Sequence, residues 1–338
     1  MMSMNEMMGD ISYTNMREML KDCLHEIHAN AEKICSSGIL SGFNHLDALM
    51  DGFEKGKVYV VGSRPCIGKE EFMLSMIRNI TWKEKTPVLL FSTNHQKSDY
   101  VKRLLSIHCG IPSFDLHKGR LDKHELERLD KGVDLLADVP LFTHDSLHLP
   151  LDELTETAKS CVREKGIRII FIDCLQMIDF ANEGENASDR IARIMMSLKQ
   201  LARSFDVPIV VGSMLNRGIE NRNGPVGKLP QLADLASSCY IEELADIVMI
   251  VQRMEYYQIY LDDCGRDLSG IMEIHVRKNG LKPSGVIYLS YDSETGIVST
   301  LEDKSAFASK LNKLRFLDTD IEALNSLITT FDLEEVNP

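Results

Sequence analysis

The sequence lacks the features that mark membrane-spanning, secreted and metal-binding chains. No stretch reaches the roughly 18 uninterrupted apolar residues that a membrane span needs. The N-terminus contains methionines but no basic start followed by an apolar block, so it does not resemble a secretion signal. The eight cysteines are scattered without a Cys-x-x-Cys pair, which predicts reduced thiols rather than a zinc site or a disulfide framework. These absences predict a cytoplasmic protein that has no membrane partner.

Positive charge is also scarce. The 338 residues include 38 Lys and Arg against 51 Asp and Glu, which gives a net charge of −13. This balance speaks against a broad nucleic-acid-binding surface, although it leaves room for a local basic loop. With 44% hydrophobic and 26% charged residues, the composition is that of an ordinary globular protein.

Short β-branched runs alternate with amphipathic helical patterns from residue 57 onward. The alternation predicts an α/β fold, in which helices cover both faces of a mostly parallel, twisted sheet. The expected strands are 58–62, 88–92, 141–143, 167–173, 209–213, 247–251, 272–276 and 286–289. The expected helices are 69–82, 99–109, 123–137, 151–165 and 188–205. No long helices separate the later strands, which predicts antiparallel strands at one edge.

Three further segments complete the predicted organisation around an α/β domain of residues 36–300. We expect residues 1–13 to be disordered and residues 14–35 to form a helix, because apolar residues recur there with a 3.6-residue period. The apolar stripe of residues 14–34 either packs on the chain's own core or docks on a neighbouring subunit. Residues 301–338 are expected to form a C-terminal helical extension.

A glycine-rich turn follows the first expected strand and opens a helix. It consists of Gly62, Ser63, Arg64, Pro65, Cys66, Ile67, Gly68, Lys69 and Glu70. Such a turn directs backbone N–H groups and the positive helix end at phosphates, while its lysine reaches the β and γ oxygens. The pattern predicts a binding loop for ATP or ADP, and the alternative is a plain strand–helix turn.

Two carboxylates bear on the magnesium ion that accompanies ATP. Glu70 stands where the phosphate-loop pattern has a Ser or Thr whose hydroxyl holds magnesium. A like charge about 4 Å from phosphate costs about 4 kcal/mol at an effective dielectric near 20. Glu70 therefore weakens triphosphate binding unless it coordinates magnesium directly, or it pairs with Lys69 and leaves the loop empty. Asp173 ends an apolar strand and is expected to orient hydrated magnesium, or to cap a helix.

Longer phrases extend these motifs from about Tyr13 to Ser299. They include Ser41-Gly-Phe-Asn-His-Leu-Asp, Phe171-Ile-Asp-Cys-Leu-Gln-Met, Ser197-Leu-Lys-Gln-Leu-Ala-Arg and Ile241-Glu-Glu-Leu-Ala-Asp. This set resembles the RecA-like motor domain of DnaB-type replicative DNA helicases. The resemblance implies ATP hydrolysis with Lys69 and Asp173 as catalytic residues, a role in DNA replication alongside other replication proteins, and a hexameric ring. In that family the helix matching 14–34 packs on the adjacent subunit, whereas the family's N-terminal collar domain has no counterpart in this sequence.

Several residues to which the family assigns catalytic roles differ here. Asn94 stands where the family has the Glu that activates water, and an amide cannot accept that proton. The neighbouring His95 is either a substitute base or an ordinary loop histidine. Met214 replaces a Gln that senses the γ-phosphate, and Ala236 replaces an arginine.

The segment that reaches the neighbouring subunit in the family also differs. Its Lys-x-Arg pair aligns with Lys278 and Gly280, so the trans-acting lysine is present and the arginine finger is absent. Such a finger contributes about 10³ to 10⁵ in rate where it has been tested. Together with Glu70, these departures predict impaired or absent hydrolysis.

The family's pore loops, which hold single-stranded DNA, match residues 216–228. Arg217, Arg222 and Lys228 lie there among Gly and Asn, which fits phosphate contacts or a solvated loop. Three functions therefore stay open. The first is a nucleotide-binding helicase paralogue or partner, and the second is an active helicase in which Glu70, His95 and Lys278 take over the lost roles. The third is an interaction protein with an empty phosphate loop.

Overall fold

The computed structural model describes residues 38–301, except 94–95, 147, 180–185, 237 and 263–264, together with residues 15–17, 19–21, 24 and 28. The chain divides into two units, Met1–Ser37 and Gly38–Pro338. In the first unit the described residues from Met16 to His28 are helical, and Met16, Met19, Leu20 and Leu24 are more than half exposed. The rest of the predicted helix, the predicted disorder of 1–13 and the extension after residue 301 lie outside the described residues.

The second unit is built on a nine-stranded sheet with the order β11-β10-β9-β8-β1-β7-β5-β2-β3. The strands are β1 (Val58–Ser63), β2 (Val88–Ser92), β3 (Leu141–Asp145), β5 (Ile169–Asp173), β7 (Ile209–Met214), β8 (Ile247–Gln252), β9 (Ile271–Asn279), β10 (Gly285–Tyr291) and β11 (Val298–Thr300). All pairs from β8 to β3 are parallel, whereas β9, β10 and β11 pair antiparallel. The predicted parallel sheet with an antiparallel edge is confirmed.

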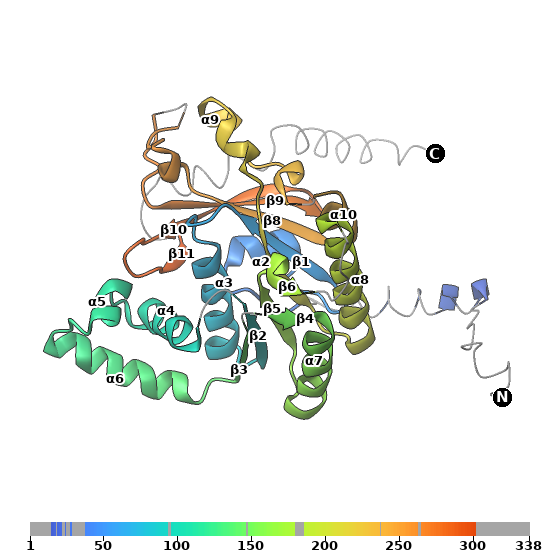
Figure 1. Ribbon diagram of the computed structural model, residues 1–338, viewed down its shortest axis with the longest axis horizontal. Coiled ribbons are helices and arrows are strands. Elements are labelled where there is room, and N and C mark those ends of the chain that lie inside the picture. Colours follow the sequence, from blue (N-terminus) through green and yellow to red (C-terminus); the bar gives the residue numbers. More distant parts are fainter. Residues whose placement is uncertain are drawn as a thin grey trace, which may run out of the picture. The chain divides into compact units, whose positions relative to one another are not determined.

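The helices lie on both faces of this sheet (Figure 1). They are α2 (Asn44–Met50), α3 (Lys69–Arg78), α4 (Lys97–Cys109), α5 (Ser113–Lys118), α6 (Lys123–Ala137), α7 (Leu151–Lys165), α8 (Ala187–Phe205), α9 (Gly224–Gly227) and α10 (Ser238–Leu244). A short pair, β4 (Leu149–Pro150) and β6 (Ile178–Asp179), forms a separate small sheet. Among the described residues, no helix is both long and apolar enough to cross a membrane.

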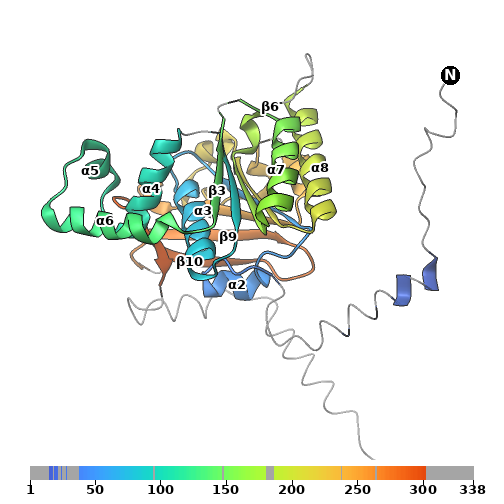
Figure 2. The same cartoon turned by 90° about the horizontal axis from the view of Figure 1, so that it is seen from below.

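Strand alternation divides the core into two layers, because successive side chains point to opposite faces. Tyr59 and Val61 of β1 pack with α2 and α3 in one cluster, and Val58 and Val60 pack with α7 and α8 in the other. Both sets of strand side chains are fully buried, which explains why the strands read as continuous apolar runs. Figure 2 shows α7 and α8 on one side of the sheet and the group α4, α5 and α6 beside α3.

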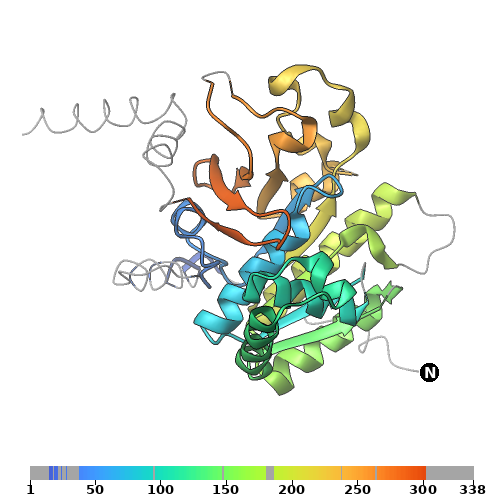
Figure 3. The same cartoon turned by 90° about the vertical axis from the view of Figure 1, so that its left-hand side faces the viewer.

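The predicted elements agree with the structure to within a few residues, with two informative differences. The strand expected from residue 167 begins at Ile169, and the helix expected over 69–82 is α3 followed by a π-helical turn, Asn79–Lys83. The apolar helical period continues through that turn, so periodicity alone could not distinguish the two. In Figure 3 the α9 segment (yellow) lies near the antiparallel strands (orange), away from α4, α5 and α6 (turquoise to green).

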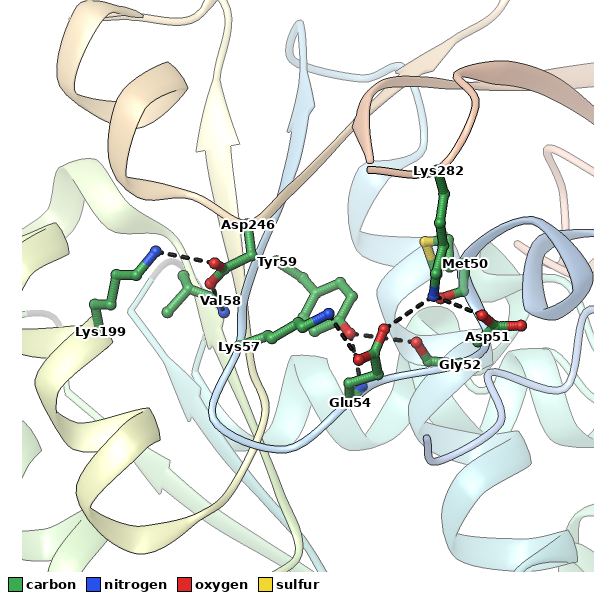
Figure 4. Close-up of polar contacts among 10 residues, drawn as sticks. All are labelled: Met50, Asp51, Gly52, Glu54, Lys57, Val58, Tyr59, Lys199, Asp246 and Lys282. Carbon is green, nitrogen blue, oxygen red and sulfur yellow. Dashed lines mark hydrogen bonds and ion pairs between the residues drawn. The ribbon is translucent and has the colours of Figure 1, made fainter. Parts of the chain in front are cut away.

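Ionic contacts join loops to the end of the sheet where the parallel strands begin (Figure 4). Lys199 of α8 donates to the Leu244 carbonyl and to Asp246 Oδ1, both at 2.9 Å, and Asp246 Oδ2 accepts from the Val58 N–H at 2.9 Å. The buried hydroxyl of Tyr59 accepts from the Glu54 N–H at 2.6 Å. These bonds fix the entries to β1 and β8.

The turn after β9 is attached to the same end. Lys282 Nζ contacts the Met50 carbonyl, Asp51 and Glu54 at 2.7 to 2.9 Å (Figure 4). Burial alone would raise the pKa of Glu54, but hydrogen bonds from Lys57 and Lys282 lower it below its ordinary value. Glu54 therefore remains charged and connects the start of β1 to the β9–β10 turn.

Candidate nucleotide-binding site

The predicted phosphate loop lies between β1 and α3, at the carboxyl ends of the parallel strands. Gly68 precedes α3 with φ of 109°, a conformation that favours glycine, and a Cβ there would lie 2.7 Å from Met272 Cε. A cleft of about 500 Å³ opens at the loop and is lined by Ser63, Arg64, Pro65, Cys66, Gly68, Lys69, Glu70, Glu71, Arg103, Met214, Arg253, Tyr291 and Ser293. Clefts at this edge of open α/β sheets are the usual ligand sites.

Lys69 and Asp173 meet at the base of this cleft. Lys69 Nζ lies 2.5 Å from Asp173 Oδ1, and the two side chains are 8% and 13% exposed. Burial alone would lower the pKa of Lys69, but the carboxylate of Asp173 raises it above its ordinary value. The structure thus brings together the two residues predicted to be catalytic, and Lys69 pairs with Asp173.

A glycine on the neighbouring strand makes room for this ion pair. A Cβ on Gly212 of β7 would lie 2.4 Å from Asp173 Oδ1 and 3.0 Å from Lys69 Nζ. No real Cβ approaches an oxygen that closely, so any side chain at position 212 would displace the pair. Gly212 was not among the predicted site residues, because its role depends on which strand lies beside β5.

The ends of β2 and β5 are fastened to each other beside the pair. Thr93 Oγ1 donates to the Asp173 carbonyl at 2.8 Å and accepts from the Cys174 N–H at 2.9 Å. These bonds fix the backbone of Asp173 where the strand ends. Asn94 and His95, which follow directly, lie outside the described residues, so the prediction about water activation stays a prediction.

Glu70 is held by an arginine that sequence reasoning missed. Nη1 of Arg103, on α4, lies 2.7 Å from Glu70 Oε2 and 3.0 Å from Glu71 Oε1. Burial raises the pKa of Glu71 above its ordinary value, and Arg103 opposes that rise. An arginine on the helix after β2 was the available signal, but its 33-residue separation from Glu70 hides the contact in the sequence.

The predicted magnesium ligands, Glu70 and Asp173, line one small cavity of about 20 Å³ together with Arg103 and Tyr100. That volume suits about one water molecule, whereas magnesium takes an octahedral shell in which several ligands are usually waters. Each carboxylate already contacts a cation, Arg103 or Lys69. The described residues contain no group of three His, Cys, Asp or Glu suited to a metal ion. This arrangement does not fit a magnesium site.

Two further arginines line the cleft. Arg64 pairs with Glu220 at 2.6 Å and donates to the Leu215 carbonyl at 2.9 Å. Arg253, which follows β8, donates to the carbonyl of Cys66 at 3.0 Å and pairs with Glu255 at 2.8 Å.

Arg253 also packs against an aromatic ring. Its guanidinium lies 4.4 Å from the centre of the Tyr291 ring, and burial raises the pKa of Tyr291 to about 12. The tip of the phosphate loop is therefore braced by a neutral tyrosine and an arginine that come from the last strands of the sheet. Neither residue was predicted as part of the site.

Met214 ends β7 and lines the cleft, at the position predicted to lack γ-phosphate sensing. Its N–H donates to Gln176 Oε1 at 3.1 Å, and its carbonyl accepts from the Ala236 N–H at 3.0 Å. Gln176 also donates to the Ser213 hydroxyl at 2.9 Å. The amide nearest to this position in the described contacts is therefore occupied by backbone and hydroxyl groups.

Lys278 is bound within its own chain. Its ammonium donates to the carbonyls of Glu242 and Ala245 at 2.6 Å and of Glu243 at 3.1 Å, at the end of α10. Burial lowers the pKa of Lys278, and the nearby Lys199 lowers it further. Gly280 lies in the following turn with φ of 59°. The trans-acting role of Lys278 stays a prediction.

The predicted DNA-binding residues lie on the segment between β7 and β8. Arg222 pairs with Asp234 at 2.6 Å, and Lys228 donates to the Glu220 carbonyl at 2.8 Å and lies over the Tyr257 ring. Arg217 is exposed and has no polar contact among the described residues. The structure therefore commits two of the three cations to contacts within this segment.

Comparison with known proteins agrees with this geometry. Residues 38–298 match the family model of the DnaB-like helicase C terminal domain. The chain is 32% identical to a probable replicative DNA helicase of Trieres chinensis, over 82% of this chain and 60% of that protein. It is 33% identical to the replicative DNA helicase DnaB of Helicobacter pylori, over 74% of this chain and 51% of that protein. The chain thus spans about half to three-fifths of these relatives.

Solved structures show the same relationship. A helicase ATPase domain superposes with a TM-score of 0.77 at 25% identity, covering 86% of this chain and all of that one. A DnaB-like replicative helicase, solved in a study of its interactions with primase, gives a TM-score of 0.76 at 25% identity and covers 86% of this chain and 68% of that one. The RecA-like fold and the resemblance are confirmed, and the chain belongs to the family of DnaB-like helicase C-terminal domains.

Proposed function

We propose that this protein binds a nucleotide at the loop of residues 62–70, hydrolyses ATP poorly or not at all, and acts in DNA replication as a paralogue or partner of an active helicase. Family membership and the cleft of about 500 Å³ support the nucleotide. The strand, glycine-rich turn and helix keep the arrangement that presents backbone N–H groups to phosphate.

The observation that carries the proposal is the pairing of every lysine and arginine that lines the cleft. Lys69, Arg64, Arg103 and Arg253 each contact a carboxylate of the same chain at 2.5 to 2.8 Å. Phosphoryl transfer depends on free cations that stabilise the charge of the transition state. Here each cation must first leave a carboxylate, so ground-state binding is weakened and transition-state stabilisation even more.

The substituted residues act in the same direction. Glu70 adds negative charge at the helix end where a hydroxyl would hold magnesium, and the thioether of Met214 cannot hydrogen-bond a γ-phosphate well. Lys278 would have to leave three carbonyls of its own chain to reach a neighbour. A protein that holds nucleotide as a structural ligand needs none of these functions.

Partners form the less constrained part of the proposal. We infer self-association through the helix within 14–34, whose described apolar residues are exposed, and a ring like that of the family is its expected form. Contact with single-stranded DNA has its best support at Arg217. Interaction with other replication proteins is proposed by analogy with the solved relative that was studied with primase.

The test measures binding and turnover together. ADP binding by calorimetry and phosphate release from ATP are followed with magnesium, with and without single-stranded DNA. Wild-type protein is expected to bind ADP and to release phosphate at least about a hundredfold below the ordinary range of about 1–10³ s⁻¹. Glu70→Thr is expected to bind magnesium–nucleotide about tenfold more tightly, since a repulsion worth about 1.4 kcal/mol or more is removed. Glu84→Thr, at an exposed glutamate outside the cleft, is the matched control.

Two outcomes would contradict the proposal in different ways. Turnover stimulated by DNA at ordinary rates would identify an active helicase in which Glu70, His95 and Lys278 have taken over the lost roles. Absence of any nucleotide binding would leave an interaction protein with an empty loop.

A further inference from the structure

We propose that Arg103 neutralises charge where a divalent metal would otherwise do so, and that the cleft therefore binds a nucleoside di- or triphosphate without metal. This inference rests on the proposed function, because it requires a nucleotide in the cleft. It starts from the mismatch between the site and magnesium: the two carboxylates expected to hold the ion share their cavity with a guanidinium.

The position of Arg103 suits this role. It lines the cleft of about 500 Å³, the adjoining cleft of about 360 Å³ and the small cavity between Glu70 and Asp173. In the described part of the chain its ionic contacts use Nη1 alone. Nε and Nη2 therefore keep donors for phosphate oxygens while Nη1 holds Glu70 and Glu71, and a planar guanidinium can serve both sides.

Arg103 is also the most accessible cation of the cleft. Its side chain is 29% exposed, against 12% for Arg64, 10% for Arg253 and 8% for Lys69. An incoming phosphate can therefore reach Arg103 without displacing a deeply buried ion pair. Because the guanidinium stays next to Glu70, it also screens the phosphate from that carboxylate.

A second observation points to a polar ligand atom at this place. The hydroxyl of Tyr100 is buried, has no hydrogen-bond partner among the described residues and lines the same small cavity. The side chain is only 7% exposed, so bulk water cannot satisfy it. A phosphate oxygen or one bound water would supply the missing partner, and a hydrated magnesium ion would not fit.

The experiment compares ADP binding with magnesium and with EDTA, using the full chain and calorimetry. The wild-type dissociation constant is expected to change by less than about twofold when magnesium is removed. Arg103→Gln is expected to weaken binding in EDTA by about tenfold, since a charge-assisted hydrogen bond is lost. Arg120→Gln, at an exposed arginine that does not line these clefts, is the control and should bind like wild type.

Glu70→Thr gives a reading that does not depend on Arg103 variants remaining folded. With a hydroxyl at position 70, binding should become tighter in magnesium than in EDTA, whereas wild type shows no such difference. If wild-type ADP binding disappears in EDTA, the inference about Arg103 is overturned while the proposed nucleotide binding stands. If ADP binds in neither condition, both are overturned.

Discussion

The two ends of the parallel sheet both carry networks of charged side chains, but the networks have different partners. Where the strands begin, Lys199, Asp246 and Lys282 contact backbone carbonyls and N–H groups as well as opposite charges (Figure 4). Where the strands end, cations pair mainly with carboxylates inside an open cleft. The first arrangement closes loops onto strands, whereas the second leaves groups that a ligand can exchange.

This difference indicates what each network contributes. Removing a charge that satisfies buried backbone groups leaves those groups unpaired and costs folding free energy. Removing one partner of a half-exposed pair in a cleft costs little stability but changes the charge that a ligand meets. The exception is Lys69–Asp173, which is the most buried ion pair of the cleft.

The largest effect is expected at that exception and would break the simple division between the two ends. Gly212→Ala should lower the free energy of unfolding by about 3 kcal/mol, because the new Cβ displaces a buried ion pair. Chemical denaturation measures the loss. In an Asp173→Ala background the same substitution should cost clearly less, since the oxygen 2.4 Å from the Cβ is gone. Equal costs in both backgrounds would mean that the pair is not what Gly212 accommodates.

A smaller effect is expected where the strands begin. Lys199→Ala should lower the free energy of unfolding by about 2 kcal/mol, because Asp246 and the Leu244 carbonyl lose a charged donor. Lys55→Ala is the control, since Lys55 pairs with Asp206 on the surface with side chains 53% and 66% exposed. It should cost less than about 0.5 kcal/mol. Similar costs for both lysines in denaturation would remove the structural role assigned to this network.

The smallest effect concerns pH at the phosphate-loop end. Burial raises the pKa of Glu71, so between its unfolded value and its raised folded value the folded protein binds more protons than the unfolded chain. Stability from this group therefore falls as pH rises through that window. Relative to Glu71→Gln, wild type should gain stability from pH 7 to pH 5, by less than about 1 kcal/mol.

The control for the pH effect has the opposite shift. A hydrogen bond from Lys159 lowers the pKa of Glu156, so Glu156→Gln should not reproduce the change. Denaturation curves of the three proteins at both pH values measure it. A wild-type protein that loses stability relative to Glu71→Gln on acidification would show that Arg103 outweighs burial at Glu71.

Much of the fold could be predicted because its signals are local. Apolar runs of β1, β2, β5, β7 and β8 and the helical periods between them reflect burial on both faces of a sheet, and each lies within one short stretch of sequence. The glycine-rich loop was equally local. Short elements such as α2 and α5 were missed, since six or seven residues are too few to establish a period.

The candidate site was only partly predictable. Lys69 and Asp173 follow strands that end at one edge of a parallel sheet, so their proximity was expected across 104 residues. Arg103, Arg253 and Tyr100 carry no such signal, because their contacts depend on how helices and edge strands pack around the loop. Lys278 was predicted to reach a neighbouring subunit, and the structure instead records its contacts with α10.

The sequence by itself determined the order of strands and helices, the phosphate loop and the family, because these follow from residue type and spacing along the chain. Only the tertiary structure decided which carboxylate meets which cation. Lys69 meets Asp173 and Glu70 meets Arg103 because sheet order and helix packing bring distant segments within hydrogen-bond distance. Ionic interactions at such distances change steeply with position, so residue identities alone cannot fix them.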